Sequence, residues 1–174
     1  MFDACTPADW LETLNYLVVI GGVAVAVWFF PKKAAQEETL DRERSYRSLN
    51  DQFLRFLELQ LANPGLGTNT TDREPVWDQL SDTDRKRQVL LFDYLASVLE
   101  RAQYFLCNGP VGTSEWGVEQ WKTWEHWLDR YLQNPNFVRF WQHLAAAKDE
   151  ASYGEQFMDL VRAKLNRSAD SAAA

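Results

Sequence analysis

"SDTDRKRQVLLFDYLASVLERAQYFL", residues 81–106, is the stretch that decides the fold, because it predicts a long amphipathic helix. Ser81 and Asp84 have the spacing of a capping box at its start. Apolar residues then recur every three or four positions along one side: Leu91, Leu95, Val98, Leu99, Ala102 and Phe105. This is the clearest helix signal in the chain.

The segment before this helix, residues 31–65, begins as a charged run of helix-forming residues and becomes amphipathic toward its end. Large apolar residues there recur at spacings of three and four: Leu49, Phe53, Phe56, Leu57 and Leu61. The letters "NPG" at 63–65 are typical of a helix end, and residues 65–75 have the composition of a loop. We therefore expect one long helix followed by a loop.

Three further helices are predicted after residue 106, over residues 114–132, 135–148 and 153–165. Their apolar faces contain Trp121, Trp124, Leu128, Tyr131, Phe137, Phe140, Trp141, Leu144, Phe157, Leu160 and Val161. No window of the sequence alternates polar and apolar residues between turns, as strands do. The predicted fold is therefore all-α, with a bundle of four or five helices.

Residues 14–30 carry no charge and differ from the rest of the chain. At about 1.5 Å rise per residue they span on the order of 25 Å, slightly less than the ~30 Å hydrocarbon core of a membrane. A cleaved signal peptide would need basic residues before the apolar run, but Asp3, Asp9 and Glu12 precede it. A buried helix would usually show a polar stripe, and residues 17–30 show none. The expected structure is a single transmembrane helix.

The charges around this span predict its orientation. No Lys or Arg precedes it, whereas several come after it, so the positive-inside rule places the C-terminal part in the cytoplasm and the N-terminus outside. The residues expected at the membrane interfaces are Trp10, Trp28, Lys32 and Lys33. Gly21 and Gly22 would let a second transmembrane helix approach closely.

Composition narrows the possible functions. The net charge of -7 argues against nucleic acid as a partner, since binding it needs a basic face. Cys5 and Cys107 are too few for a disulfide framework, and the predicted membrane separates them. His126 and His143 have no second ligand at a metal-binding spacing. Because no paired catalytic groups or phosphate-binding loop occur, we expect neither enzyme activity nor a cofactor.

The tryptophans are the most unusual feature of the predicted cytoplasmic part. Trp116, Trp121, Trp124 and Trp127 fall in one predicted helix, and Trp141 in the next. As a functional site, such rings could form an aromatic cage for a cationic or planar ligand, or touch a partner protein. As structure, they form the apolar faces of amphipathic helices, and the helical spacing favours this interpretation.

Two segments, "YRSLNDQFLRFLELQLANPGL" (46–66) and "WLDRYLQNPNFVRFWQ" (127–142), come after the predicted anchor. This combination resembles a group of uncharacterised bacterial membrane-anchored helical proteins of the DUF4760-like kind. The resemblance covers most of the chain in layout and rests on the aromatic "NPNFVRFW" segment. It implies an anchor in the bacterial inner membrane and a helical domain, and it transfers no catalytic residues.

The expected layout is an extracytoplasmic N-terminus at 1–13, a transmembrane helix at 14–30, a charged helical stalk at 31–48, a helical bundle at 49–166 and a disordered tail at 167–174. The leading hypothesis is a single-pass protein-interaction module or an accessory subunit of a membrane complex. Its expected partners are the lipid bilayer and a protein, which could be a second copy of this chain. The alternative is a membrane-tethered small-molecule sensor with a Trp-lined pocket.

Overall fold

The computed structural model describes residues 37, 39–109, 111–112, 114–147 and 152–173, and of 168–173 only the backbone. The chain divides into two compact units, Met1–Tyr46 and Arg47–Ala174. The sequence predicts that the bundle begins at residue 49, close to this division. All elements after residue 46 therefore belong to the second unit.

The described regular structure is entirely helical, which confirms the all-α prediction. Five α-helices occur among the described residues: residues 39–62, α2 (Asp82–Gln103), α3 (Glu115–Tyr131), α4 (Pro135–Ala147) and α5 (Glu155–Ala173). Three short helical turns connect them: η1 (Pro64–Leu66), η2 (Trp77–Gln79) and the π-helix η3 (Tyr104–Asn108). No strand is present in the part of the chain that the structure describes.

The predicted transmembrane helix at 14–30 and the predicted N-terminus at 1–13 lie outside the described residues. The same holds for the residues assigned to the membrane: Trp10, Trp28, Lys32, Lys33, Gly21 and Gly22. Among the helices that are described, none is both long and apolar enough to span a membrane. The anchor therefore stays a prediction.

Helix α2 begins where the sequence predicts it. The Ser81 hydroxyl accepts a hydrogen bond from the Asp84 backbone N–H at 3.1 Å and donates one to the Asp84 carboxylate at 2.7 Å. This cap satisfies one of the backbone donors that every helix start leaves open. The predicted apolar face of α2 is buried from Leu91 to Ala102, while Phe105, in η3, is half-buried.

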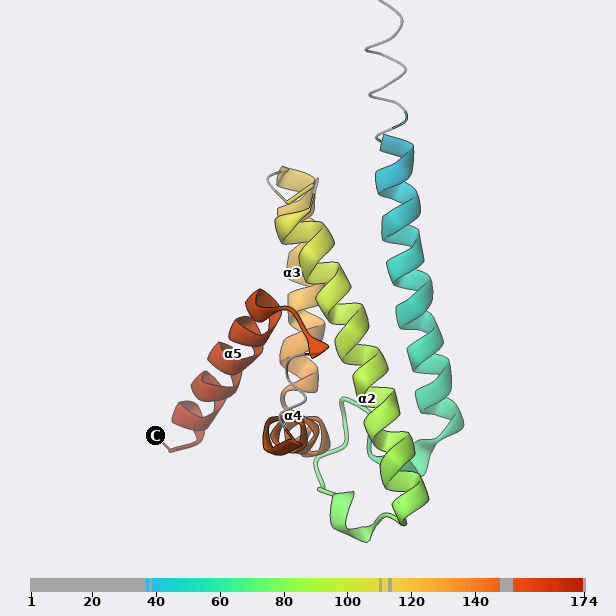
Figure 1. Cartoon of the computed structure of the whole chain (residues 1–174), viewed down its shortest axis with the longest axis vertical. Coiled ribbons are helices and arrows are strands. Elements are labelled where there is room, and N and C mark those ends of the chain that lie inside the picture. The colour runs from blue at the N-terminus through green and yellow to red at the C-terminus, as the bar shows by residue number, and fades with distance from the viewer. Residues whose placement is uncertain (1–36, 38, 110, 113, 148–151, 174) are drawn as a thin grey trace, which may run out of the picture. The chain divides into compact units, whose positions relative to one another are not determined.

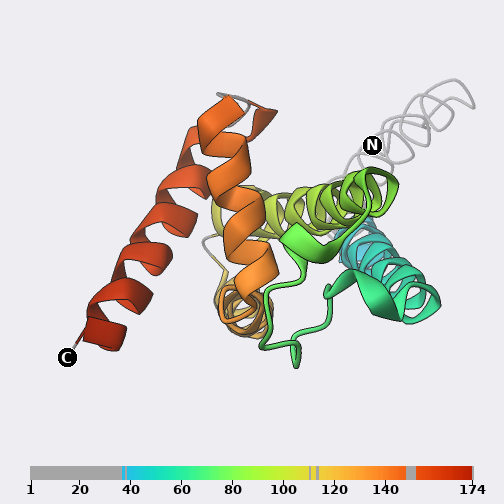
Figure 2. The ribbon, with the colours of Figure 1, turned by 90° about the horizontal axis from the view of Figure 1, so that it is seen from below.

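The second unit is built around α2. Residues 47–62 of the first helix lie along it, joined by a hydrogen bond from the Tyr94 hydroxyl to the Gln52 carbonyl at 3.2 Å. Helix α3 also runs beside α2, and α4 crosses them, so that α4 is seen end-on in Figure 1 and lengthwise in Figure 2. Figure 2 also shows α5 beside α4.

Aromatic rings from four helices form the centre of this unit. Phe137 of α4 lies 5.1 Å from Phe92 of α2 and 5.9 Å from Tyr131 of α3, between ring centroids. Tyr131 in turn lies 5.7 Å from Phe56 of the first helix. All four side chains are fully buried. Edge-on and tilted contacts of this kind add to the energy of burial.

The helices of the structure differ from the sequence expectation in two places. The first concerns the apolar face of residues 49–61, because Leu61 is 75% exposed although Leu49, Phe53 and Phe56 are buried. The second concerns the C-terminus, where α5 continues to Ala173, through most of the predicted disordered tail. Alanine favours helix even without packing contacts, which is a physical reason for the extension.

Gly117 sits where the first turn of α3 meets the preceding loop. A Cβ at this position would lie 2.3 Å from the Val111 carbonyl oxygen and 3.0 Å from that of Leu106. Alanine normally stabilises a helix interior by about 1 kcal/mol relative to glycine, but a backbone clash cannot be relieved by a rotamer change. We expect Gly117→Ala to lower the free energy of unfolding by about 2 kcal/mol, measured by urea unfolding.

Gly65 provides the matched control for this prediction, because a Cβ there would meet nothing within 4 Å. We expect Gly65→Ala to change the free energy of unfolding by less than about 1 kcal/mol, and in the stabilising direction. If Gly117→Ala stabilised the protein as much as Gly65→Ala, the close packing of the α3 start would be refuted.

Candidate functional site

Trp124 and Trp127 join α3 to the first helix. Trp124 is buried, and its ring centroid lies 5.5 Å from that of Phe53. Trp127 is half-buried, 5.1 Å from the Phe53 ring, and the Arg130 guanidinium lies 5.2 Å from its centroid. These two predicted site residues are therefore brought together on Phe53, as parts of a helix-to-helix contact.

Trp141 belongs to another aromatic group, formed by α4 and the start of α5. It is 3% exposed, and its ring lies 5.4 Å from Tyr153 and 6.2 Å from Phe157. The remaining predicted residues, Trp116 and Trp121, are half-buried on α3. The five tryptophans thus do not line one common surface.

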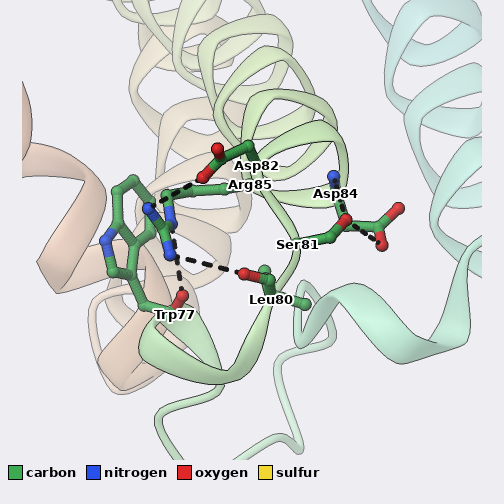
Figure 3. A network of polar contacts seen from close by, with 6 residues as sticks. All are labelled: Trp77, Leu80, Ser81, Asp82, Asp84 and Arg85. Carbon is green, nitrogen blue, oxygen red and sulfur yellow. Dashed lines mark hydrogen bonds and ion pairs between the residues drawn. The ribbon is translucent and has the colours of Figure 1, made fainter.

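Trp77 is a buried tryptophan that sequence reasoning missed, because η2 has no helical periodicity to reveal it. Figure 3 shows how Arg85 holds this corner: it donates hydrogen bonds to the carbonyl oxygens of Trp77 at 3.4 Å and Leu80 at 3.3 Å. The guanidinium also pairs with Asp82 at 3.6 Å and lies 5.9 Å from the Trp77 ring centroid. Arg85 therefore joins the Trp77–Leu80 segment to the start of α2.

Asn136 holds the loop 66–76 from the side of α4. It is completely buried in the first turn of that helix. Its amide nitrogen donates to the carbonyl oxygens of Gly67 at 3.1 Å and Glu74 at 3.0 Å, and its amide oxygen accepts from the Val76 N–H at 2.8 Å. One side chain thus satisfies three backbone groups at both ends of the loop.

Asn134 supports the same loop and also caps α4. Its amide nitrogen donates to the carbonyl oxygens of Gly67 at 2.9 Å and Asn69 at 2.7 Å. Its amide oxygen accepts from the Asn136 N–H at 2.8 Å. We call Asn134 and Asn136 together the amide clasp. The sequence signal for the cap is the "NPN" triplet at 134–136, because Asn favours the N-cap and Pro the first helical position.

Two glutamines also bind the loop. Gln60 of the first helix donates to the Thr68 carbonyl, and Gln88 of α2 donates to the Leu66 carbonyl. Gln60 also contacts the Tyr131 hydroxyl at 3.5 Å. Burial raises the pKa of Tyr131 to about 12, partly offset by the Gln60 hydrogen bond and by Arg130. The Tyr131 hydroxyl thus links α3 to the first helix through Gln60.

Helix α5 is attached by polar contacts at both ends of its packed part. The buried Lys164 ammonium lies 2.8 Å from the Glu125 carboxylate and 2.7 Å from that of Asp129, both on α3. At the other end, the Tyr153 hydroxyl donates to Asp93 at 2.5 Å. Burial and the neighbouring Asp93 raise the pKa of Tyr153 far above its usual range. These contacts join α5 to α3 and α2.

Cys107 is the free cysteine of the described residues and lies half-buried in η3. Burial, followed by the nearby Glu125 carboxylate, raises the pKa of its thiol. A thiol with a raised pKa is a poor nucleophile at neutral pH, because the thiolate is the reactive form. The described residues also contain no group of three or more potential metal ligands.

Leucines near the C-terminal end of the first helix form the remaining candidate site. Leu54 is 56% exposed and Leu61 is 75% exposed, with the half-buried Leu57 between them at helical spacing. We call these three residues the leucine stripe. The helical spacing in the sequence groups Leu57 and Leu61 with Leu49, Phe53 and Phe56 and does not include Leu54. Exposed leucines at helical spacing are a surface on which another helix can pack.

Comparison of the chain with protein-family models, with curated proteins and with solved structures found no match. The resemblance noted from the sequence therefore stays a prediction. The candidate site rests on the geometry of the described residues alone.

Proposed function

We propose that this chain is a single-pass membrane-anchored helical protein that acts as a protein-interaction module or as an accessory subunit of a membrane complex. The observation that carries the interaction role is the leucine stripe, exposed on the edge helix of the second unit. The anchor, in a bacterial inner membrane, is supported by the uncharged residues 14–30. The basic residues after this span support a cytoplasmic helical domain.

A Trp-lined pocket for a small molecule is less well supported. Trp124 and Trp141 are buried, and their rings are in contact with Phe53 and with Tyr153 and Phe157 respectively. A cage for a ligand would need several of these rings around one accessible space. Their packing against other aromatic side chains instead favours a structural role for Trp124 and Trp141 in the core.

The anchor and its orientation are tested by labelling with a membrane-impermeant maleimide. Two variants are compared. In the first, Cys107→Ser leaves Cys5 as the reporter of the N-terminus. In the second, both cysteines are replaced by serine and Glu155→Cys, exposed at the start of α5, is the reporter of the helical domain. We expect Cys5 to react in intact cells and position 155 to react only after permeabilisation. Recovery of the chain in the soluble fraction, or the reverse labelling pattern, would refute the proposed topology.

The interaction role is tested by photo-crosslinking in native membranes, with benzoylphenylalanine placed at position 61. Position 90 is the control, because Leu90 on α2 is also exposed, at 67%, but lies outside the leucine stripe. We expect a discrete crosslinked protein product from position 61 and none from position 90. Recovery of only uncrosslinked monomer from position 61 would count against an interaction module.

A further inference from the structure

Helix α5 covers an aromatic side chain of α4. Tyr153, just before α5, and Phe157, in its first turn, are both buried, and their rings lie 5.4 Å and 6.2 Å from that of Trp141. Met158 and Val161 of α5 are buried as well. Figure 2 shows the two helices side by side. If α5 moved away, Trp141 would lose the rings that cover it on this side.

The start of α5 is fastened to α2 by contacts that end on carboxylates. The Gly154 backbone N–H donates to the Glu100 carboxylate at 2.5 Å, and the Tyr153 hydroxyl donates to that of Asp93 at 2.5 Å. Hydrogen bonds to a charged acceptor are stronger than those to a neutral one. This end of the attachment therefore weakens when either carboxylate loses its charge.

Further along α5, Lys164 is the buried partner of an ion cluster with α3. Its side chain is 7% exposed, whereas those of Glu125 and Asp129 are 37% and 48% exposed. A buried ammonium without a counter-charge is strongly unfavourable, so α5 depends on these two carboxylates. The Cys107 thiol of η3, which also lies near Glu125, has a raised pKa and stays uncharged in acid.

The loop and the core of the second unit are held by groups that do not titrate in acid. The loop 66–76 is bound by the neutral side chains of the amide clasp and by Gln60 and Gln88. The core consists of aromatic rings such as Phe92 and Phe137. Carboxylic acids, in contrast, ordinarily become neutral at about pH 4. Acid should therefore act on the attachment of α5 before it acts on the loop or the core.

We propose that α5 is an acid-releasable strap: protonation of the carboxylates on α2 and α3 detaches it and uncovers Trp141, while the rest of the second unit stays folded. The carboxylates interact with α5 in their charged form, so docking is favoured above the pH range in which they titrate and is lost as the pH falls through it. Once Glu125 and Asp129 are neutral, Lys164 is more stable in water than in its buried place. The strap uses neither the anchor nor the leucine stripe, and it stands or falls independently of the proposed function.

The acid form can be imitated at neutral pH by substitution. Glu125→Gln combined with Asp129→Asn keeps the shape of both side chains and removes both charges. In the detergent-solubilised full chain we expect the backbone amides of 157–164 to exchange hydrogen at least about tenfold faster, while those of α2 and α4 exchange as in the parent. Glu119→Gln is the control, because Glu119 is an exposed carboxylate of the same helix that pairs with Lys122 at 2.6 Å. Unchanged exchange of α5 in the double variant would overturn the proposal.

Adding Lys164→Met to this double variant separates release from general damage. Methionine fills much of the same apolar space and has no charge that must return to water. We therefore expect the α5 amides of the triple variant to exchange within about threefold of the parent rate. If the triple variant exchanged as fast as the double variant, the unpaired ammonium would not be the cause of release and the proposal would be wrong.

Acid titration of the parent tests the switch itself. Exchange rates are divided by those of an unstructured peptide at each pH, and we expect α5 alone to lose protection between about pH 5 and pH 3. The triple variant should retain more of this protection, because the Asp93 and Glu100 contacts remain sensitive to acid while the Lys164 site no longer is. Loss of protection in α5 and α2 together would make α5 an ordinary part of one cooperative unit and would exclude a strap.

Discussion

Replacing Phe137 with alanine is expected to lower the free energy of unfolding by about 4 kcal/mol, a large part of the stability of a domain of this size. Phe137 has no exposed surface, and its ring lies between 5.1 and 5.9 Å from those of Phe92, Tyr131, Phe140 and Trp141. These neighbours come from three helices, so a cavity here cannot close by the movement of one element.

The measurement is urea unfolding of the detergent-solubilised full chain, monitored by far-ultraviolet circular dichroism. A lower midpoint with an unchanged slope would report lost stability. Phe137→Leu conserves most of the volume and should cost less than about 1.5 kcal/mol. The surface control Tyr104→Ala, at a side chain that is 65% exposed, should stay within about 0.5 kcal/mol of the parent. If Phe137→Ala lowered the free energy of unfolding no more than the surface control does, Phe137 would not be a central residue of the core.

Helix boundaries were predicted best where the signal is local. Ser81 and the residues after it specify the start of α2 by hydrogen bonds within a single turn, and the structure contains those bonds. Asn134 and Pro135 do the same for α4. Such signals need no knowledge of the rest of the fold, which is why sequence reasoning found these elements.

How far the covered face of the first helix extends could not be predicted in the same way. Leu49, Phe53 and Leu61 all fit one helical repeat, yet only the first two are buried. The extent of a buried face depends on which neighbours the helix has, and the first helix is contacted by α2 at Gln52 and by α3 at Phe53, whereas Leu61 stays exposed. Local periodicity contains no information on those neighbours. The leucine stripe became visible only with the structure.

The buried polar side chains were missed for a related reason. Asn136, Gln60 and Gln88 hold a loop that lies far from each of them in sequence. A polar residue near an apolar face is ordinarily assigned to solvent, and only the partner backbone groups explain its burial. In the Trp-rich helix, Trp124 is buried whereas Trp121 and Trp127 are half-buried, and helical spacing alone could not rank these three side chains by exposure.

Asn136→Ala is expected to lower the free energy of unfolding by about 3 kcal/mol, because it removes three hydrogen bonds made by a fully buried side chain and leaves the Glu74 carbonyl and the Val76 N–H without their side-chain partner. Asn136 supplies hydrogen bonds to Gly67, Glu74 and Val76 at distances between 2.8 and 3.1 Å. Asn108→Ala is the control, since that side chain is exposed and makes a single 3.4 Å contact with Gln103. It should cost no more than about 0.5 kcal/mol.

Hydrogen exchange distinguishes loss of the clasp from general unfolding. In Asn136→Ala, the Val76 amide should exchange faster, because its acceptor is gone, while the amides of α2 keep their relative protection.

Asn136→Asp tests the orientation of the Asn136 amide group. A carboxylate can still accept from Val76, but it cannot donate to the carbonyl oxygens of Gly67 and Glu74, and it places a charge against them in a buried site. We therefore expect Asn136→Asp to be more destabilising than Asn136→Ala at neutral pH, and the reverse order would refute the assigned amide orientation.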